Sequence, residues 1–484
     1  MSEFNRRGTA LIEHPVMAPP PLRSVQDRAR RYLFRRRLRA GIGACAVVAI
    51  AAASVALWSA GPAAGPRPRL AAGVLEALPA PAVAPVPPGP ARAHGTPGTW
   101  RLASYLSEPL GWRRNTNSGP AAGGYLSCPQ AGTCYYAGAA GGGDPSGPSP
   151  SLSTLYVSHD GGLSWTAIRI VGAGFTTALT CPVAGHCMAG GEISGRAVLL
   201  TTSDGGYRWD YRALPPGDGS LDELVCPAVA SCRGLAAPSG GSLARRSSLA
   251  WFLRTDNAGA DWSRISFPPG DVMSSLSCLN AAACVAAGTG DGHVNAAGDS
   301  PMVALRTADG GRSWTAAGLP AGLSFPAHSP GTVACAGAST CYALALSPQP
   351  SAEGYFDWSV VLISIDSGVT WRMLALPPHT PTPGLFNISC PDARHCWIAG
   401  TEAVPQTIPG GGQNGESAMI LATGNGGESW SKATFAAVRL ASGQQSDSLM
   451  AVGEIACAQG GSCVGLGIAE QGSYHTPVYT NAGG

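Results

Sequence analysis

Cysteine is the residue whose type and spacing most clearly suggest chemistry in this chain. Of the 15 cysteines, Cys45 lies in an apolar run, and the remaining 14 (15 − 1) form seven pairs with the same C-x5-C spacing. The pairs are Cys128/Cys134, Cys181/Cys187, Cys226/Cys232, Cys278/Cys284, Cys335/Cys341, Cys390/Cys396 and Cys457/Cys463. Such thiols could bind zinc or form disulfides. A structural zinc requires four ligands in one cluster, and these isolated pairs lack that cluster, so we expect seven local disulfides, no metal and no other cofactor.

The sequence around each pair has the pattern of an apolar strand, a tight polar loop and a second apolar strand, as in LSCPQAGTCYYAGA and ISCPDARHCWIAGT. This pattern predicts a β-hairpin in which one strand ends at the first cysteine and the next starts at the second. Opposed residues of an antiparallel pair lie about 4.5 to 5.5 Å apart at Cα, a distance that a disulfide can bridge.

Carboxyl and amide side chains recur in a second motif, S/T-x-D-x-G-x-x-W, which follows six of the seven hairpins. Its Asp or Asn can accept hydrogen bonds from turn N–H groups, its Gly permits a positive φ, and its Trp supplies a large apolar surface. We therefore interpret these acids and amides as folding residues and not as catalytic groups. They are Asp160, Asp204, Asn257, Asp309, Asp366 and Asn425.

The second motif resembles the Asp-box of bacterial neuraminidases and of other propellers of the BNR type, which include sialidase-like, photosystem II assembly-factor-like and VPS10-like members. The resemblance covers about residues 99–484. It implies a β-propeller fold. Because the functions of these families differ widely, it implies little about activity.

Each repeat contains four predicted strands, so we expect an all-β fold in which residues 99–484 form a seven-bladed propeller of four-stranded antiparallel blades. The chain ends at Gly484 in the middle of an Asp-box. Residues Gly98–Tyr105 resemble the sequence that follows the Gly-Gly pair in the other boxes. We therefore predict that an N-terminal strand, 98–105, supplies the outer strand of the last blade and closes the ring.

An enzyme of the sialidase type would need an arginine triad, a tyrosine nucleophile backed by Glu, and an acidic Asp. No residues can be assigned to these roles, so the catalytic residues are unknown. A broader glycoside hydrolase needs two carboxyl groups that face one cleft. Candidate acids for this alternative, which we interpret as solvated loop acids, are Glu192, Glu402, Glu470, Asp291 and Asp299.

Ligand recognition is expected in the loop between the second and third strands of each repeat, where the length varies most. These loops cover residues 141–151, 237–247, 288–301, 347–358 and 401–417. The hairpin turns and Asp-boxes are predicted to share the opposite face of the ring. The polar and aromatic candidates in the variable loops are Arg245, Arg246, His293, Tyr355, Phe356, Trp358 and Gln413. Packing at a strand start is the alternative role for Phe356 and Trp358.

The charge is divided unevenly along the chain. Residues 1–92 carry 13 Arg against 4 acids, a net charge of +9, whereas the remainder carries 18 basic residues against 25 acids, a net charge of −7. The propeller therefore gives no electrostatic reason to expect nucleic acid as a partner.

A basic segment, residues 28–39, precedes the uncharged apolar run 40–61. The run has the length of a transmembrane helix, and the positive-inside rule places its N-terminal side in the cytoplasm. We expect a basic cytoplasmic tail (1–39), a single-pass signal anchor (40–61) and a Pro/Ala-rich spacer (62–98). A cleaved signal peptide is the alternative to the anchor, and lipidation of Cys45 is not expected.

The function expected from these patterns is a cell-membrane protein whose extracytoplasmic propeller binds or scaffolds a protein or glycan of the cell envelope. The alternative is a carbohydrate-active enzyme, a glycoside hydrolase with a carboxylate pair in the propeller funnel. More of the patterns favour binding than enzymatic activity.

Overall fold

The computed structural model describes the compact unit Leu70–Gly484 in parts. The described residues are 73–76, 99–107, 125–138, 153–170, 176–193, 196–214, 218–238, 251–268, 270–290, 301–325, 331–347, 358–377, 384–404, 415–435, 451–468 and 475–481. Within these ranges no helix has the length and apolarity needed to cross a bilayer, and the predicted anchor, 40–61, lies outside them.

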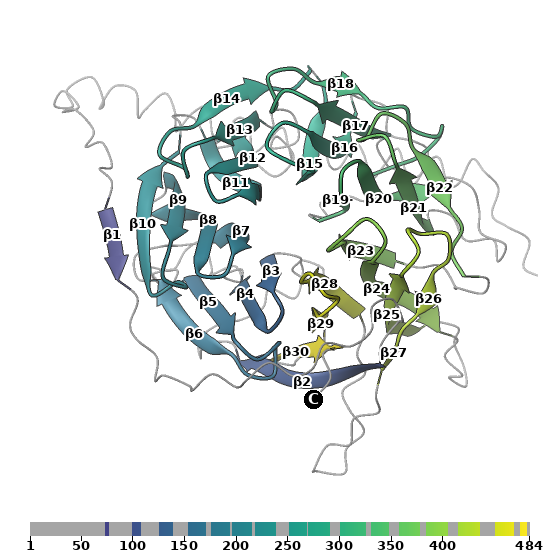
Figure 1. Ribbon diagram of the computed structural model, residues 1–484, viewed down its shortest axis with the longest axis horizontal. Coiled ribbons are helices and arrows are strands. Elements are labelled where there is room, and N and C mark those ends of the chain that lie inside the picture. The colour runs from purple at the N-terminus through teal and green to yellow at the C-terminus, as the bar shows by residue number, and fades with distance from the viewer. Residues whose placement is uncertain are drawn as a thin grey trace, which may run out of the picture. The chain divides into compact units, whose positions relative to one another are not determined.

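Seven antiparallel sheets form a ring, with one strand of each sheet at the centre (Figure 1). Blade 1 contains β3 (Tyr125–Gln130), β4 (Thr133–Gly138), β5 (Ser153–Ser158) and β6 (Thr166–Ile170). Blade 2 contains β7 (Thr176–Val183), β8 (His186–Ile193), β9 (Arg196–Thr202) and β10 (Arg208–Ala213). Blade 3 contains β11 (Asp218–Ala228), β12 (Ser231–Pro238), β13 (Trp251–Thr255) and β14 (Ser263–Ser266).

The remaining blades repeat this order from the inner to the outer strand. Blade 4 contains β15 (Val272–Cys278), β16 (Cys284–Thr289), β17 (Met302–Thr307) and β18 (Thr315–Ala316). Blade 5 contains β19 (Val333–Ala336), β20 (Thr340–Ser347), β21 (Trp358–Ser364) and β22 (Arg372–Leu374). Blade 6 contains β23 (Gly384–Ser389), β24 (Cys396–Val404), β25 (Gly415–Thr423) and β26 (Ser431–Lys432). Blade 7 contains β28 (Ala451–Cys457), β29 (Cys463–Ile468), β30 (His475–Thr480) and β2 (Thr99–Ser107).

Each inner strand contacts the inner strand of the next blade, and β28 contacts β3, which closes the ring. The middle strands of a blade are buried on both faces because neighbouring blades cover them. Val361 and Leu362, which are consecutive in β21, are both 0% exposed. This is why such strands read in the sequence as continuous apolar runs and not as alternating ones.

The predicted start of the second strand at the second cysteine needs a small correction. It holds in blades 4, 6 and 7, where β16, β24 and β29 begin at Cys284, Cys396 and Cys463. In the other four blades the strand begins one residue earlier, because the residue before the cysteine already pairs across the hairpin or continues the extended backbone. The second cysteine is then the second residue of its strand: Cys134 in β4, Cys187 in β8, Cys232 in β12 and Cys341 in β20.

Strand β2 is the outer strand of blade 7, as expected from the text of residues 98–105. It pairs antiparallel with β30, with Arg101 opposite Thr480 and Ser107 opposite His475. Its first two residues also pair parallel with β27 (Thr434–Phe435), beyond the last strand of blade 6. The N-terminal strand therefore completes the last blade and connects it to the preceding one (Figure 1).

Trp100 on β2 is 0% exposed and belongs to a core cluster formed by blades 6 and 7. The Asp-box tryptophans occupy equivalent places. Trp430 of blade 6 packs in a cluster formed with blade 5, and Trp209 of blade 2 packs in a cluster formed with blade 1. Trp100 thus fills in blade 7 the position that a motif tryptophan fills elsewhere.

One segment of the predicted spacer also forms a strand. β1 (Gly73–Glu76) pairs antiparallel with β10 and makes blade 2 a five-stranded sheet. Its register places Gly73 opposite Tyr211 and Glu76 opposite Arg208. The Pro/Ala-rich composition of the spacer did not predict this pairing, because a four-residue edge strand forms only where an existing sheet can pair with it.

Candidate functional site

The described part of the ring has two distinguishable faces. In blades 1 to 6 the fourth residue of the Asp-box donates its N–H to a carbonyl in the C-x5-C turn of the same blade, as from Gly205 to Gly185 and from Gly426 to Arg394. The two turns therefore share one face, which we call the disulfide face. The connections between second and third strands leave from the opposite face, which we call the variable-loop face.

All seven predicted disulfides are present, and each closes within its own hairpin. The paired Cα atoms are 3.9 to 4.2 Å apart. In blades 4, 5 and 7 the bonded cysteines are also direct cross-strand partners. The hairpin geometry thus brings the two thiols of a pair together without help from another blade.

The second cysteine of every pair is buried in the core and does not form part of an accessible site. None of the seven is more than 3% exposed. All seven pack in core clusters, each in a different cluster around the ring. They are Cys134, Cys187, Cys232, Cys284, Cys341, Cys396 and Cys463. These sulfurs therefore stabilise the blades and are closed to ligands.

The Asp-box side chains hold their own turns. In all six boxes the fifth residue donates its N–H to the first residue's hydroxyl, and the seventh donates to the Asp or Asn Oδ1, at 2.8 to 3.0 Å. Hydrogen bonds from Ser313 and Thr307 hold the pKa of Asp309 well below its ordinary range. A carboxylate so stabilised is unsuited to serve as a general acid.

The fifth residue of the box must be glycine for two reasons. Gly311 has a φ of +88°, which favours glycine, and a Cβ there would lie 2.0 Å from the Phe252 ring of the preceding blade. The turn therefore fixes both its own backbone and its contact with the neighbouring blade.

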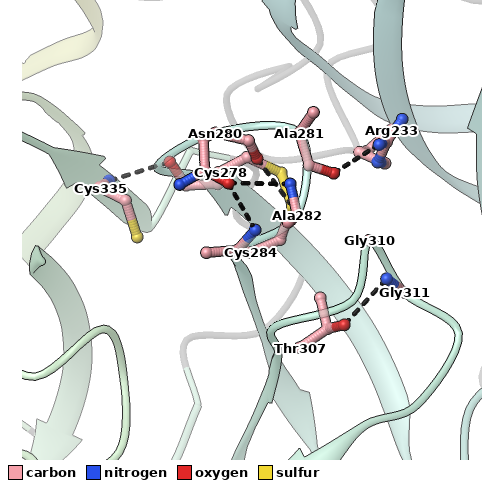
Figure 2. Close-up of a disulfide and its surroundings, with 12 residues drawn as sticks. Arg233, Cys278, Asn280, Ala281, Ala282, Cys284, Thr307, Gly310, Gly311 and Cys335 are labelled. Carbon is pink, nitrogen blue, oxygen red and sulfur yellow. Dashed lines mark hydrogen bonds between the residues drawn. A yellow bond between two sulfur atoms is a disulfide. The ribbon is translucent and has the colours of Figure 1, made fainter. Parts of the chain in front are cut away.

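A second set of contacts on the disulfide face, which the sequence reasoning did not anticipate, joins neighbouring blades. In blades 1, 3 and 5 the residue after the second cysteine reaches into the C-x5-C turn of the next blade. Tyr135 accepts the N–H of Gly185, Tyr342 donates to the Ala393 carbonyl, and Arg233 donates to the Ala281 carbonyl. Figure 2 shows the Arg233 contact beside the disulfide between Cys278 and Cys284.

Arg233 is 0% exposed and also pairs with Asp256, at 2.9 Å. Arg254 donates to the other carboxylate oxygen of Asp256 and to the carbonyls of Asp309 and Gly310 in blade 4. Burial opposes ionisation of Asp256, but the hydrogen bonds and charges of both arginines lower its pKa. These charged groups therefore join blades 3 and 4.

Most of the predicted recognition residues lie outside the described residues. Trp358 begins β21, and its backbone pairs with Ser347. The others are Arg245, Arg246, His293, Tyr355, Phe356 and Gln413. All belong to connections between a second and a third strand, so their expected placement on the variable-loop face stays a prediction.

The candidate acids of the hydrolase alternative are described only in part. The interpretation of Glu402 as a solvated loop acid is wrong, because it is buried on β24 and forms an ion pair with Lys432 of the same blade. The backbone of Glu192 lies in β8 opposite Ala197. Glu470, Asp291 and Asp299 lie outside the described residues.

A different group of carboxyls gathers at the centre of the ring. Asp222 and Glu223 lie on β11 of blade 3, and Glu454 lies on β28 of blade 7. The charges of Asp222 and Glu454 both act on the Glu223 carboxyl, which also accepts the backbone N–H of Gly331 in blade 5. We call Asp222, Glu223 and Glu454 the axial acid cluster.

The sequence contains a signal for this cluster that is visible only in hindsight. Glu223 and Glu454 each stand three residues before the first cysteine of their blade, next to an irregularity in the strand register. Ser275 and Asn387 occupy the same place in blades 4 and 6, where they accept the N–H groups of Val333 and Ile455. The position is thus a polar contact point in several blades.

The comparisons with known proteins give similarity of fold. No family model matches the chain, and no curated protein matches it. Among solved structures it is similar to YCF48 bound to a D1 peptide, with a TM-score of 0.48, 14% identity, and coverage of 82% of this chain and 99% of that chain.

Two further similar structures are enzymes by their names. The GH74 xyloglucanase from Xanthomonas campestris has a TM-score of 0.41 and 13% identity, covering 73% of this chain and 66% of that one. The phage phi92 endosialidase has a TM-score of 0.38 and 11% identity, covering 79% and 68%. These similarities concern the fold alone, which both binding proteins and glycoside hydrolases use.

Proposed function

We propose that this protein is an Asp-box propeller that is anchored in the cell membrane by residues 40–61 and binds a protein or glycan of the cell envelope through its variable-loop face. Support for the Asp-box assignment comes from the hydrogen-bond pattern that six turns repeat. Support for export comes from the seven disulfides, since disulfides persist in oxidising compartments.

The observation that carries the binding proposal is how the described carboxyl groups are used. The Asp-box acids hold turns, Asp256 joins two blades, and Glu402 pairs with Lys432. A rigid ring whose variable loops leave from one face is a scaffold for recognition. Binding needs only that arrangement, whereas hydrolysis also needs two accessible carboxyls.

The second candidate function is glycoside hydrolysis, and one observation favours it. Glu223 and Glu454 interact across the centre of the ring, and burial raises the pKa of Glu223 to about 8, as in a general acid beside a carboxylate. However, Glu223 is only 8% exposed. Hydrolysis requires that both carboxyls reach the sugar, so binding remains the better supported function.

The proposed topology predicts that protease added to intact spheroplasts digests or releases the propeller. The seven arginines between 28 and 39 hold the N-terminal side of the apolar run in the cytoplasm, which leaves the propeller outside. Immunoblotting for the C-terminal region measures the result. Full protection of that region would contradict the orientation.

The binding proposal predicts that full-length chain in detergent captures a specific envelope component from membranes. Replacing residues 405–414 with Gly and Ser should abolish capture, because these residues belong to the longest variable loop. Leu163→Ser is the matched control, since Leu163 is 43% exposed on the disulfide face. Equal capture by both variants would place recognition elsewhere, and no capture by the wild type would refute the proposal.

A further inference from the structure

The charged residues on the described parts of the inner strands, which line the centre of the ring, are all acidic. The seven inner strands, as far as the structure describes them, carry four acids, Asp218, Asp222, Glu223 and Glu454, and no Lys, Arg or His. The charges of Glu223 and Glu454 act on one another across the centre of the ring, and acids so placed create a negative potential that favours a positive ligand.

Glu223 supplies a second, independent observation. It is 92% buried, as its exposure of 8% shows, and its Oε2 has no hydrogen-bond donor among the described residues. The carboxyl also receives the N–H of Gly331, a glycine whose φ is +70° and where a Cβ would lie 2.1 Å from Asn387 Nδ2. The backbone of blade 5 is therefore brought close to Asn387 of blade 6, while Glu223 retains one unused acceptor.

Solvent reaches the cluster beside this acceptor, because Asp222 is exposed and Glu454 is partly exposed. Glu454 stands three residues after Ala451, where β28 begins at the variable-loop end, about 10 Å along an extended strand, and its charge acts on the Glu223 carboxyl. A ligand that reaches them must be slender and long. The extended side chains of Lys and Arg meet this condition, and a sugar ring does not.

We propose that the axial acid cluster binds the ammonium or guanidinium group of a Lys or Arg side chain contributed by the protein partner. This inference rests on the proposed binding function and names the chemistry of the partner. The bound cation donates hydrogen bonds to Glu223 Oε2 and to Glu454. Glu223 is then ionised, and the positive charge of the ligand compensates its negative charge in the protein interior.

Binding is coupled to one proton. Burial first, and then the charges of Asp222 and Glu454, raise the pKa of Glu223, while the Gly331 N–H opposes them; the result is about 8. Glu223 therefore carries a proton at neutral pH and releases it to solvent when the cation arrives. Affinity should rise with pH up to about 8, since less proton must then be displaced.

The test measures the affinity of a fluorescent hexa-arginine peptide for full-length chain in detergent, by anisotropy. We expect saturable binding by the wild type and a loss of about 10- to 100-fold in the Glu223→Gln/Glu454→Gln variant, the range for hydrogen bonds to charged groups. Glu428→Gln removes one exposed carboxyl on the disulfide face and should change affinity less than about 2-fold. The rise of affinity with pH should disappear in Glu223→Gln, which keeps the shape of the side chain.

Equal affinity of the wild type and the double variant, or no peptide binding, would overturn the inference. So would displacement of the peptide by equimolar Ca²⁺, which would identify an inorganic cation as the ligand. Unchanged melting temperatures exclude misfolding as the cause of a loss. An envelope partner that the wild type and the double variant capture equally would refute the axial site while leaving the proposed binding function intact.

Discussion

Deletion of residues 98–105 is expected to lower the melting temperature of the full chain far more than deletion of residues 81–88 from the spacer. The first deletion removes most of β2, exposes the edge of β30 and takes Trp100 out of the core between blades 6 and 7. The second leaves the ring intact. Calorimetry or circular dichroism measures the difference, and equal melting temperatures would show that the ring does not depend on β2.

A single substitution separates the tryptophan from the strand pairing. Trp100→Ala should cost about 3–5 kcal/mol of unfolding free energy, the range for removal of a buried aromatic side chain. Tyr105→Ala is the matched control on the same strand, because Tyr105 is 43% exposed, and it should cost less than about 1 kcal/mol. Equal losses of unfolding free energy would mean that the Trp100 side chain contributes nothing to stability beyond the strand pairing of its backbone.

Complete reduction of the seven disulfides is expected to unfold the propeller at physiological temperature. Each bridge closes a loop of seven residues, worth about 2.4 kcal/mol in the chain-entropy model. Several such contributions together exceed the ~5–15 kcal/mol of net stability typical of a folded protein. Circular dichroism during a dithiothreitol titration measures the loss.

The matched control for reduction is the double variant Cys390→Ser/Cys396→Ser, which removes one bridge and retains six. It should stay folded with a lower melting temperature. A reduced protein that melts cooperatively at the temperature of the oxidised one would disprove the dependence. Free thiols at the fourteen paired positions in exported protein, detected by mass spectrometry, would contradict the local bridges themselves.

The fold could be predicted because its determinants are local. A C-x5-C pair and an Asp-box each specify one turn through residues close in sequence, as Thr202, Asp204 and Gly206 do, and seven pairs with six boxes then specify seven blades. The closing strand could be predicted for the same reason. The sequence around Trp100 resembles the end of an Asp-box, and Trp100 fills the place of a motif tryptophan in blade 7.

The axial acid cluster could not be predicted because its members meet only after the ring closes. Three residues before the first cysteine, the seven blades carry Tyr125, Ala178, Glu223, Ser275, Thr332, Asn387 and Glu454. No recurring sequence motif marks this position. Glu223 and Glu454 are far apart in sequence, and their interaction follows from the circular order of the blades. The interblade role of Arg233 escaped prediction similarly, since its partner Ala281 belongs to the next blade.

The attachment of the N-terminal segment has a mechanical consequence. All seven covalent bridges lie within single hairpins, so none of them shares a load that pulls on the chain before Gly73. Tension from that side first meets the four residue pairs between β1 and β10, and then the pairing of β2 with β30. Force would therefore detach blade 2's added strand and open the seam of blade 7 while the hairpins stayed intact. The propeller would therefore open in two steps, first at β1 and then at β2, before any hairpin that a disulfide holds unfolds.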